Sequence, residues 1–408
     1  MDEFKTRRWL QLALVNFCIV ALAGVTLRYK INFPLPLINQ KYLLYAHSHF
    51  AFVGWVSTAL MALLVNYLER NEIYTNYKKY NRIIIVNCIN AYGLFLSFLF
   101  QGYRILSISF STLSIFISFY FIYHFWKDLK LVLDKSYAVN WFKMALILWG
   151  TSAIGAFTLA YLMATHNTNQ EYYFAAIYFF LHFQYNGWFL FVCFGLLFYH
   201  LYRSGLVQEV AINKKLFFIM ATTVAPSFLL SILWLKLPAY LRYIADISGI
   251  LQLLVLLYFL KLIPAIKKFI PHSFTKTTRT LWILATIAFI IKVILQMLSI
   301  IPYFSHFAFA FRPIVIGYLH LSFLCIISFF IIGYINEYLC TRHRHVSVIG
   351  VILFIIGVLV QEVILMVQGL EVFQMEPIPL ANILLFYCAI LIAAGIIRIT
   401  YKMNKTDK

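Results

Sequence analysis

The sequence predicts an all-α integral membrane protein with about twelve transmembrane helices, arranged as three four-helix arcs around a pseudo-threefold axis. Three observations predict this fold. The 408 residues are 63% hydrophobic and 12% charged, whereas soluble domains carry about 25% charged residues. The apolar residues lie in runs long enough to cross a bilayer, and three of these runs share a histidine pattern. We expect residues 1–408 to form a single polytopic membrane domain.

The predicted helices are the apolar runs between charged residues. Each run is about twice as long as a ten-residue membrane strand and none alternates with a period of two, which excludes a β-barrel. In chain order their approximate bounds are 8–28, 42–68, 81–101, 104–126, 139–165, 172–202, 214–235, 239–262, 280–301, 313–337, 346–369 and 380–401.

The lysines and arginines predict the topology. Of the 33, 25 lie at the termini and in one set of alternate loops, seven lie in the opposite loops, and Lys292 lies inside a run. By the positive-inside rule, both termini face the cytoplasm. The formal charge of +19 therefore indicates topology and contact with the headgroups of the lipid bilayer, and excludes nucleic acid as a partner. We expect the protein to lie in a bacterial inner membrane.

Two local patterns have alternative interpretations. The run 8–28 has a basic start and contains Ala21-Leu22-Ala23, which also fits a cleavable signal peptide. Its removal would leave an odd number of helices, so we expect it to remain as the first helix. The six cysteines lie singly, without a CxxC or CxxCH motif, and therefore predict no disulfide, cysteine zinc site or covalently attached haem.

Four of the eleven histidines lie inside predicted helices, on the second, sixth and tenth runs: His47, His49, His182 and His320. A polar side chain in hydrocarbon must find a partner, so each is either a helix-to-helix hydrogen bond or a functional group. All three helices are predicted to run from outside to inside. His49, His182 and His320 precede a basic residue at the inner end by 21, 21 and 22 residues. The imidazoles are therefore predicted to share one layer in the outer half of the membrane.

The residues that follow these histidines are also similar. Five residues after His49 comes Gly54-Trp55, and five after His182 comes Gly187-Trp188. At the corresponding place after His320, Cys325 replaces the glycine. The pattern indicates an internal repeat of about 135 residues, and such repeats decide architecture. Three arcs of four helices would bring the histidines together.

Twelve helices with histidines on the second, sixth and tenth resemble the haem–copper oxidase superfamily, which includes cytochrome oxidase subunit I and the large subunit of nitric oxide reductase. The stretch AHSHFAFVGW (46–55) resembles the His-x-His haem-ligand helix of that superfamily. HFQYNGW (182–188) resembles the sixth-helix motif of nitric oxide reductases, with Asn186 in place of an acidic residue, and IGYLH (316–320) resembles the tenth-helix His-x-His, with Tyr318 in place of its first histidine. The NnrS family, haem proteins of nitric oxide metabolism, has a similar His-x-His helix.

The sequence departs from the superfamily at the oxygen-reducing centre. The oxidases hold copper with a pair of adjacent histidines on the seventh helix, but residues 214–235 contain no histidine. Tyr318 stands where the proximal ligand of the active-site haem is expected. Both differences argue that the usual oxygen-reducing centre is absent.

The resemblance implies haem b, whose iron takes two axial imidazoles. By the superfamily's geometry the pair is His47 and His320. Arg312, about two turns outward of His320, is the candidate to neutralise the haem propionates, and Arg28 and Lys30 in the first outer loop are weaker candidates.

His49 and His182 remain for other clefts, because residues two apart on a helix point about 200° away from each other. They could belong to a second haem, a copper ion or a non-haem iron ion, or form only hydrogen bonds. Two imidazoles are too few for a closed metal site, so water, Tyr185, Asn186 or Tyr318 would have to complete it. His182, Tyr318 and Asn186 are accordingly the catalytic candidates, and an open position would suit a small gas ligand such as nitric oxide.

Lys292 in the ninth run and Glu362 in the eleventh are charged groups within the membrane. Such charges usually pair. One interpretation is a Lys292–Glu362 ion pair between two helices, and the other is a proton path from the cytoplasm that also uses Gln296.

Three functions fit these observations. The first is a membrane b-type haem protein for respiratory electron transfer or nitric oxide chemistry or tolerance, which favours an oxidoreductase resembling nitric oxide reductase, supplied by an electron-donor protein or quinol. The second is a haem-based gas sensor or scavenger without turnover. The third is a transporter with histidines at its substrate or proton site. Transporters usually have Gly- or Pro-broken helices at such sites, and the second and sixth runs contain no proline near the histidines.

Overall fold

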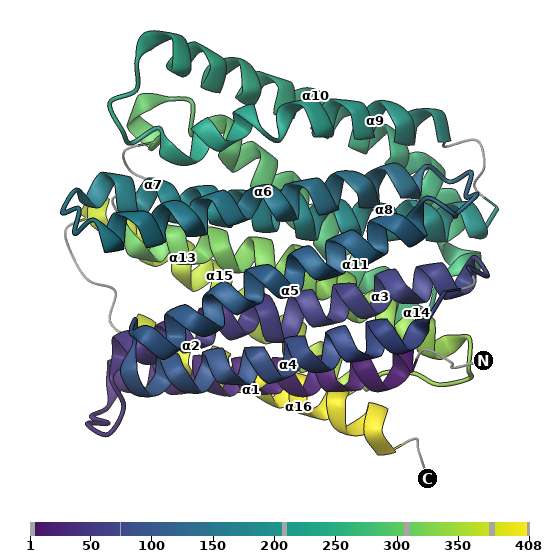
Figure 1. Ribbon diagram of the computed structural model, residues 1–408, viewed down its shortest axis with the longest axis horizontal. Coiled ribbons are helices and arrows are strands. Elements are labelled where there is room, and N and C mark those ends of the chain that lie inside the picture. Colours follow the sequence, from purple (N-terminus) through teal and green to yellow (C-terminus); the bar gives the residue numbers. More distant parts are fainter. Residues whose placement is uncertain (1–4, 74, 206–209, 306–310, 375–379, 406–408) are drawn as a thin grey trace. The chain divides into compact units, whose positions relative to one another are not determined.

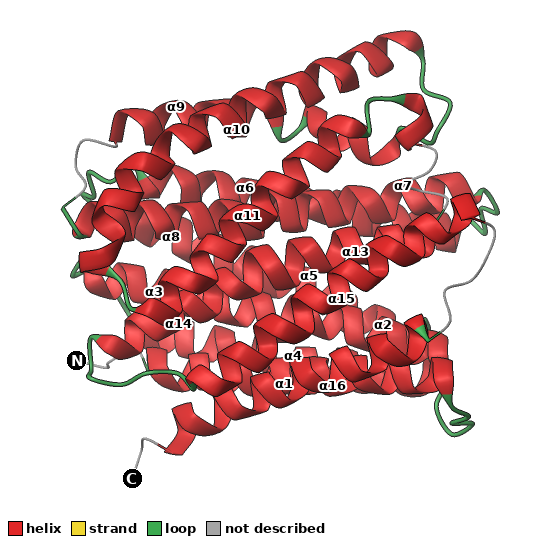
Figure 2. Cartoon of the chain, turned by 180° about the vertical axis from the view of Figure 1, so that it is seen from behind, coloured by secondary structure: helices red, strands yellow, loops and turns green. Residues whose placement is uncertain are grey.

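The computed structural model describes residues 5–73, 75–205, 210–305, 311–374 and 380–405, and these residues form helices joined by short loops, with no strand (Figures 1 and 2). The chain divides into two compact units. Unit 1 consists of Met1–Leu131 and Ser328–Lys408, and unit 2 of Val132–Ile327. The single membrane domain and its pseudo-threefold axis depend on how the two units are placed, and stay predictions.

Helices of unit 1 come from both ends of the chain. They are α1 (Thr6–Asn32), α2 (Gln40–Phe50), the π-helix η1 (Ala51–Ser57), α3 (Thr58–Arg70), α4 (Tyr77–Gln101), α5 (Ile105–Leu129), α14 (Phe329–Cys340), α15 (Val348–Gln374) and α16 (Ala381–Lys405).

Unit 2 holds the central helices. They are α6 (Ala138–Ala164), α7 (Gln170–Leu181), the π-helix η2 (His182–Phe189), α8 (Leu190–Arg203), α9 (Val210–Thr223), the 3₁₀-helix η4 (Pro226–Ile232), α10 (Ala239–Ser273), α11 (Lys276–Leu298) and α13 (Arg312–His320). A third π-helix, η5 (Leu321–Ser328), leads from α13 towards α14.

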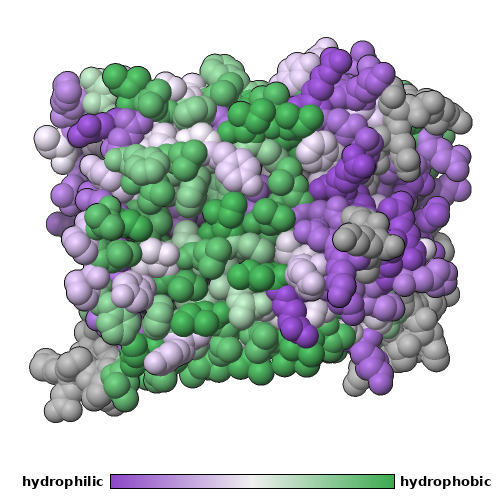
Figure 3. Space-filling model, turned by 90° about the horizontal axis from the view of Figure 1, so that it is seen from below, coloured by the Kyte–Doolittle hydropathy of each residue, from purple (hydrophilic) through white to green (hydrophobic). Residues whose placement is uncertain are grey.

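The predicted all-α membrane fold is confirmed. Among the described residues, eleven continuous helices are long and apolar enough to cross a membrane, and a bent pair raises the number to twelve. Three of the spans combine an α-helix, a π-helix and a second α-helix, over Gln40–Arg70, Gln170–Arg203 and Arg312–Cys340. Figure 3 shows hydrophobic side chains over the middle of one face and hydrophilic ones gathered towards its right-hand end. This distribution fits helices that cross a bilayer.

The seventh span differs from the single helix predicted over 214–235. It consists of α9 and η4, which are bent by 54° with the break at Val224 and Ala225. Pro226 begins η4. Proline has no N–H to continue the α-helical hydrogen bonds, and it disfavours helical geometry in the residue before it. The proline therefore explains the break.

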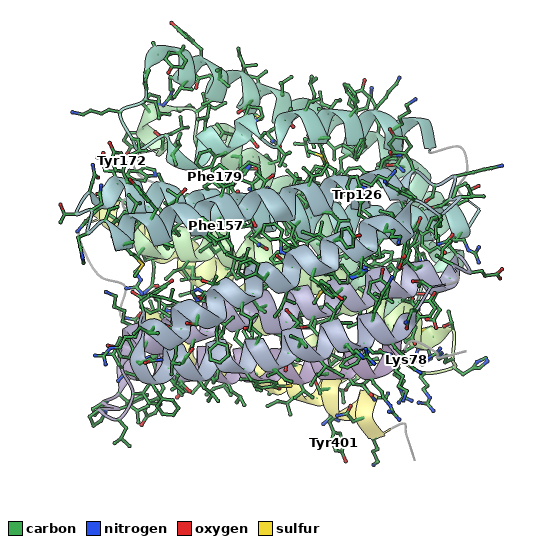
Figure 4. The ribbon with its side chains drawn as sticks, in the orientation of Figure 1. Lys78, Trp126, Phe157, Tyr172, Phe179 and Tyr401 are labelled. Atoms are coloured by element: carbon green, nitrogen blue, oxygen red, sulfur yellow. The ribbon has the colours of Figure 1, made fainter. Side chains whose placement is uncertain are left out.

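The start of α1 and the end of α16 lie at the same end of unit 1. The guanidinium of Arg7 and the amide of Gln11, near the start of α1, donate to the backbone carbonyl of Met403, near the end of α16, at 3.0 and 3.2 Å. Thr6 also donates to Glu69 at the end of α3. In Figure 4, Lys78 lies towards the end where Figure 1 marks the termini. The even number of spans in the predicted topology requires this arrangement, and the side of the membrane stays a prediction.

Close backbone contacts hold α15 against α16. A Cβ atom added to Gly395 would lie 2.6 Å from the backbone nitrogen of Phe354 and 2.7 Å from the carbonyl oxygen of Gly350. Small residues allow such approach between membrane helices, where packing replaces the hydrophobic effect. Gly155 of α6 does the same in unit 2, because its added Cβ would lie 2.7 Å from the carbonyl of Ala176 in α7.

The first outer loop is shorter than predicted. Arg28 and Lys30 lie within α1, which continues to Asn32, and the Lys30 ammonium group donates to the carbonyl of Leu35. The helix extends beyond the apolar run because both residues have long side chains that can reach the polar boundary of the membrane from a helical backbone.

Candidate functional site

Each of the three spans with intramembrane histidines changes from α-helix to π-helix at its histidine. The segment η1 begins two residues after His49, η2 begins at His182, and η5 begins directly after His320. The π-helix is rare and is frequent at functional sites. The internal repeat predicted from the sequence is therefore matched by a repeated local structure.

Side chains from neighbouring helices complete the hydrogen bonding of η1. The amide of Asn16 in α1 donates to the carbonyl of Gly54 at 2.7 Å, and its oxygen accepts a hydrogen bond from the Tyr92 hydroxyl at 2.7 Å. The amide of Asn87 in α4 and the Thr58 hydroxyl donate to the carbonyl of Val53. A π-helix shifts its hydrogen bonds from four residues to five, so polar partners stabilise carbonyls near the transition.

A stacked aromatic pair follows the histidine in two of the three spans. Trp55 of η1 stacks on Phe17 of α1 with ring centroids 4.4 Å apart, and Trp188 of η2 stacks on Trp149 of α6 at 4.1 Å. The interplanar angles are 3° and 7°. In these two spans the repeat therefore extends to the contact with the helix that precedes the histidine span.

His47 and His49 face different helices, as their spacing predicts. His47 Nδ1 lies 3.0 Å from the carbonyl oxygen of Val20 in α1, and Gly24 of α1 lies against the imidazole edge. The His49 ring instead stacks on Phe98 of α4, with ring centroids 4.2 Å apart. The two imidazoles cannot bind the same metal ion in these positions.

The hydrogen bonds of both residues fix the tautomer. His49 Nδ1 lies 2.9 Å from the carbonyl oxygen of Tyr45. A carbonyl only accepts, so Nδ1 carries the proton in His47 and His49, and Nε2 keeps its lone pair. Metal-bound histidines show this arrangement, because a carbonyl acceptor at the other nitrogen orients the ring and increases its basicity. Both residues therefore fit a haem or metal ligand through Nε2.

His182 has a different arrangement. Its Nε2 lies 2.7 Å from the carbonyl oxygen of Val224, at the break of the seventh span, and its Nδ1 lies 3.1 Å from the amide nitrogen of Asn186. Nε2 therefore donates and Nδ1 accepts. A metal ion at His182 would have to replace one of these hydrogen bonds. Of the two candidates for a second centre, His49 keeps a ring nitrogen, Nε2, without a hydrogen bond to the described residues.

The other candidate residues of η2 and α13 are linked through Tyr185. Asn186 contacts both His182 and Tyr185, and Tyr318 packs edge-on against Tyr185 with ring centroids 6.3 Å apart. Arg312 is exposed at the first position of α13, and His320 is the last residue of that helix. Eight residues of helix separate them by about 12 Å. His47 belongs to unit 1 and His320 to unit 2, so the predicted axial pair stays a prediction.

A small cavity of about 20 Å³ lies in unit 2 beside the break of the seventh span. This volume accommodates one or two water-sized molecules. Leu190 and Phe289 form part of its apolar wall. Its polar lining comes from Asn186, Thr223, Ser227, Gln252, Lys292 and Gln296.

Lys292 is buried in unit 2, and Glu362 is half-buried in unit 1. The Lys292 ammonium group donates to Gln296 Oε1 at 2.9 Å, one turn away on α11. Glu362 Oε1 has no hydrogen-bond partner, and Arg28 lies within electrostatic range of both Glu362 and His47. The predicted Lys292–Glu362 ion pair stays a prediction. Arg28 is a positive charge within electrostatic range of His47.

Several structural residues did not emerge from the sequence, although polar residues within apolar runs signal them. Asp128 at the end of α5 accepts hydrogen bonds from Thr75 and Tyr80 and pairs with Lys79 at 2.7 Å. Asn16 and Asn87 support η1, as described above. Among the described residues, no group of three histidine, cysteine, aspartate or glutamate side chains could hold a metal ion.

The fold and the buried polar groups define this chain as an all-α polytopic membrane protein. The sequence matches no protein-family model and no curated protein. The resemblance to the haem–copper oxidases therefore stays a prediction from the sequence motifs.

Proposed function

We propose that the protein is a membrane b-type haem protein, with His47 and His320 as axial ligands, that serves respiratory electron transfer or nitric oxide chemistry or tolerance. The observation that carries the proposal is the tautomer of His47. A donated Nδ1 proton at the Val20 carbonyl leaves the Nε2 lone pair for iron. The π-helix at each histidine span adds support.

The residues present fit a haem. Gly24 lies beside the His47 imidazole without a side chain, and Arg28 supplies a positive charge within electrostatic range of it. A cation at this level can neutralise propionates in a low-dielectric setting, in addition to Arg312. Bound haem would supply one-electron redox chemistry. His47 would hold and orient the group through a ring that the Val20 carbonyl keeps in place.

The absorption spectrum of the purified protein tests the proposal. A sharp Soret band and split α and β bands after reduction with dithionite are expected. His47→Ala and His320→Ala should each remove the low-spin signal. His200→Ala, near the end of α8, should retain it. Full haem content in both ligand variants would overturn the assignment. Consumption of nitric oxide with a reductant would then distinguish an enzyme from a sensor.

A specific observation favours transport as a second candidate function. Transporter sites are typically formed by discontinuous helices near the middle of the membrane. The seventh span is broken at Val224 and Ala225, and the cavity that Lys292 lines lies beside the break. Absence of haem from the purified protein would favour this function over the first.

A further inference from the structure

The cavity beside the broken span contains a buried positive charge. Lys292 is 4% exposed, and its ammonium group donates to Gln296 Oε1, which uses one of its three protons. No carboxylate among the described residues of unit 2 pairs with Lys292, and Asp246 pairs with Arg242 instead. A buried ammonium group is costly without an opposite charge. The cavity therefore favours a ligand that is negatively charged.

The lining of the cavity also includes an amide with an unpaired oxygen. Asn186 is 6% exposed, and its nitrogen donates to His182 Nδ1, while its oxygen has no hydrogen-bond partner. Because the nitrogen points to His182, the oxygen is the amide atom left for the cavity. An unpaired buried acceptor costs free energy. A state of the site in which this oxygen accepts a hydrogen bond would avoid that cost.

His182 is placed to bind a second proton. Its Nε2 already donates to the Val224 carbonyl, which lies at the helix break. If Nδ1 also carried a proton, it would need an acceptor in place of the Asn186 nitrogen. Rotation of the Asn186 amide by half a turn would supply its oxygen as that acceptor. The same rotation would direct the amide nitrogen, a hydrogen-bond donor, into the cavity beside Lys292.

We propose that this cavity binds a small monovalent anion, such as chloride or nitrite, together with one proton on His182. The proton comes from water and adds to Nδ1, and no other bond breaks. The anion then meets the ammonium group of Lys292 and the turned amide of Asn186. The volume of about 20 Å³ limits the ligand to a few heavy atoms. This site does not depend on the haem proposal, because none of its residues is an axial ligand.

Electrostatics makes the proton and the anion bind cooperatively. Lys292 on α11 is the charged group within electrostatic range of His182, and its neighbours from η2 and η4, Phe183 and Phe228, are uncharged. Two positive charges in a low-dielectric site repel each other, and an anion between them offsets the repulsion. By linkage, each ligand then increases the affinity for the other by the same factor.

Titration calorimetry of the full chain in lipid nanodiscs tests the proposal. Sodium chloride and sodium nitrite would be added in separate series in a gluconate buffer between pH 5 and 8. Saturable binding is expected, with an affinity that weakens by up to about tenfold per pH unit as His182 loses its proton. Lys292→Met should abolish binding, and Lys143→Met, in α6 of the same unit, should preserve it. His182→Gln should bind more weakly, and its affinity should depend less on pH than that of the unaltered chain.

A spectroscopic measurement keeps the test independent of folding defects. In protein labelled with ¹⁵N-histidine, added anion should convert one imidazole from singly to doubly protonated, and His182→Gln should lack this change. The proposal would be overturned by binding that does not depend on pH or by unchanged binding to Lys292→Met. Loss of iron or copper from the protein in His182→Ala would also overturn it. Absence of binding together with strong coupling between Lys292→Met and Glu362→Gln in thermal stability would overturn it in favour of the ion pair. Haem content, measured on the same samples, tests the haem assignment separately.

Discussion

Asn16 provides a sharp test of how the π-helix η1 is stabilised. The side chain is fully buried, donates to the Gly54 carbonyl at 2.7 Å and accepts from the Tyr92 hydroxyl at 2.7 Å. Asn16→Leu keeps a similar volume and removes both hydrogen bonds. Side-chain hydrogen bonds within membranes contribute about 0.6 kcal/mol on average and at most about 1.7 kcal/mol. Two lost bonds and an unpaired carbonyl therefore predict a loss of about 2 kcal/mol in the free energy of unfolding.

Asn90 offers a matched control in the same unit. It is 1% exposed, and neither its amide nitrogen nor its oxygen has a hydrogen-bond partner. Asn90→Leu should leave the free energy of unfolding unchanged or raise it, because it replaces unpaired polar atoms by apolar ones.

Unfolding in mixed detergent micelles, followed by circular dichroism, would measure both variants. A double-mutant cycle of Asn16→Leu with Tyr92→Phe should give a coupling energy of about 0.6–1.7 kcal/mol. Equal effects of Asn16→Leu and Asn90→Leu, or full additivity in the cycle, would refute the role assigned to Asn16.

Four further predictions follow from other contacts. Gly395→Ala should destabilise unit 1 by about 1–3 kcal/mol, because the added Cβ meets backbone atoms of α15. Gly24→Ala should be neutral or stabilising, because its added Cβ lies 3.4 Å from the nearest atom of His47. Equal midpoints of thermal unfolding for the two variants would contradict this. Asp128→Asn should cost about 1.5–3 kcal/mol by the same assay, since it weakens three contacts including the Lys79 ion pair, and a change below the error would speak against that network. A reporter fused after Lys408 should be active in the cytoplasm, and periplasmic activity alone would disprove the twelve-span topology. Reduced protein should bind carbon monoxide at a second centre and lose this response in His49→Ala, whereas one iron per chain, no copper and no response to carbon monoxide or nitric oxide would leave His49 a packing residue.

The membrane spans were predictable from the sequence because their signal is additive along the chain. Twenty apolar residues between charges are sufficient to identify a helix in a bilayer, and the bounds of α6 and α16 differ from the runs 139–165 and 380–401 by a few residues. The break at Val224 was also within reach, since Pro226 is visible in the sequence and disrupts a helix wherever it lies in its interior.

The state of the histidines was not predictable, because it depends on partners distant in sequence. The acceptor of His182 lies 42 residues away and is a backbone carbonyl, which has no sequence signature. The π-helices depend on side chains such as Asn16 and Asn87 that approach from other helices. Sequence spacing identified the helices of His47, His49 and His182, and only the structure distinguishes their tautomers.

The three π-helices also determine where this chain can change length. A π-helix closes its hydrogen bonds over five residues, so the loss of one residue from η1 converts it to an α-helix and leaves both flanking helices in place. The loss of one residue from α2 or α3 would instead rotate everything beyond it by about 100°. Single-residue deletions within η1, η2 and η5 are therefore the ones that the membrane helices can absorb, and relatives of this chain that differ by one residue in these spans would be aligned correctly only with the gap placed there.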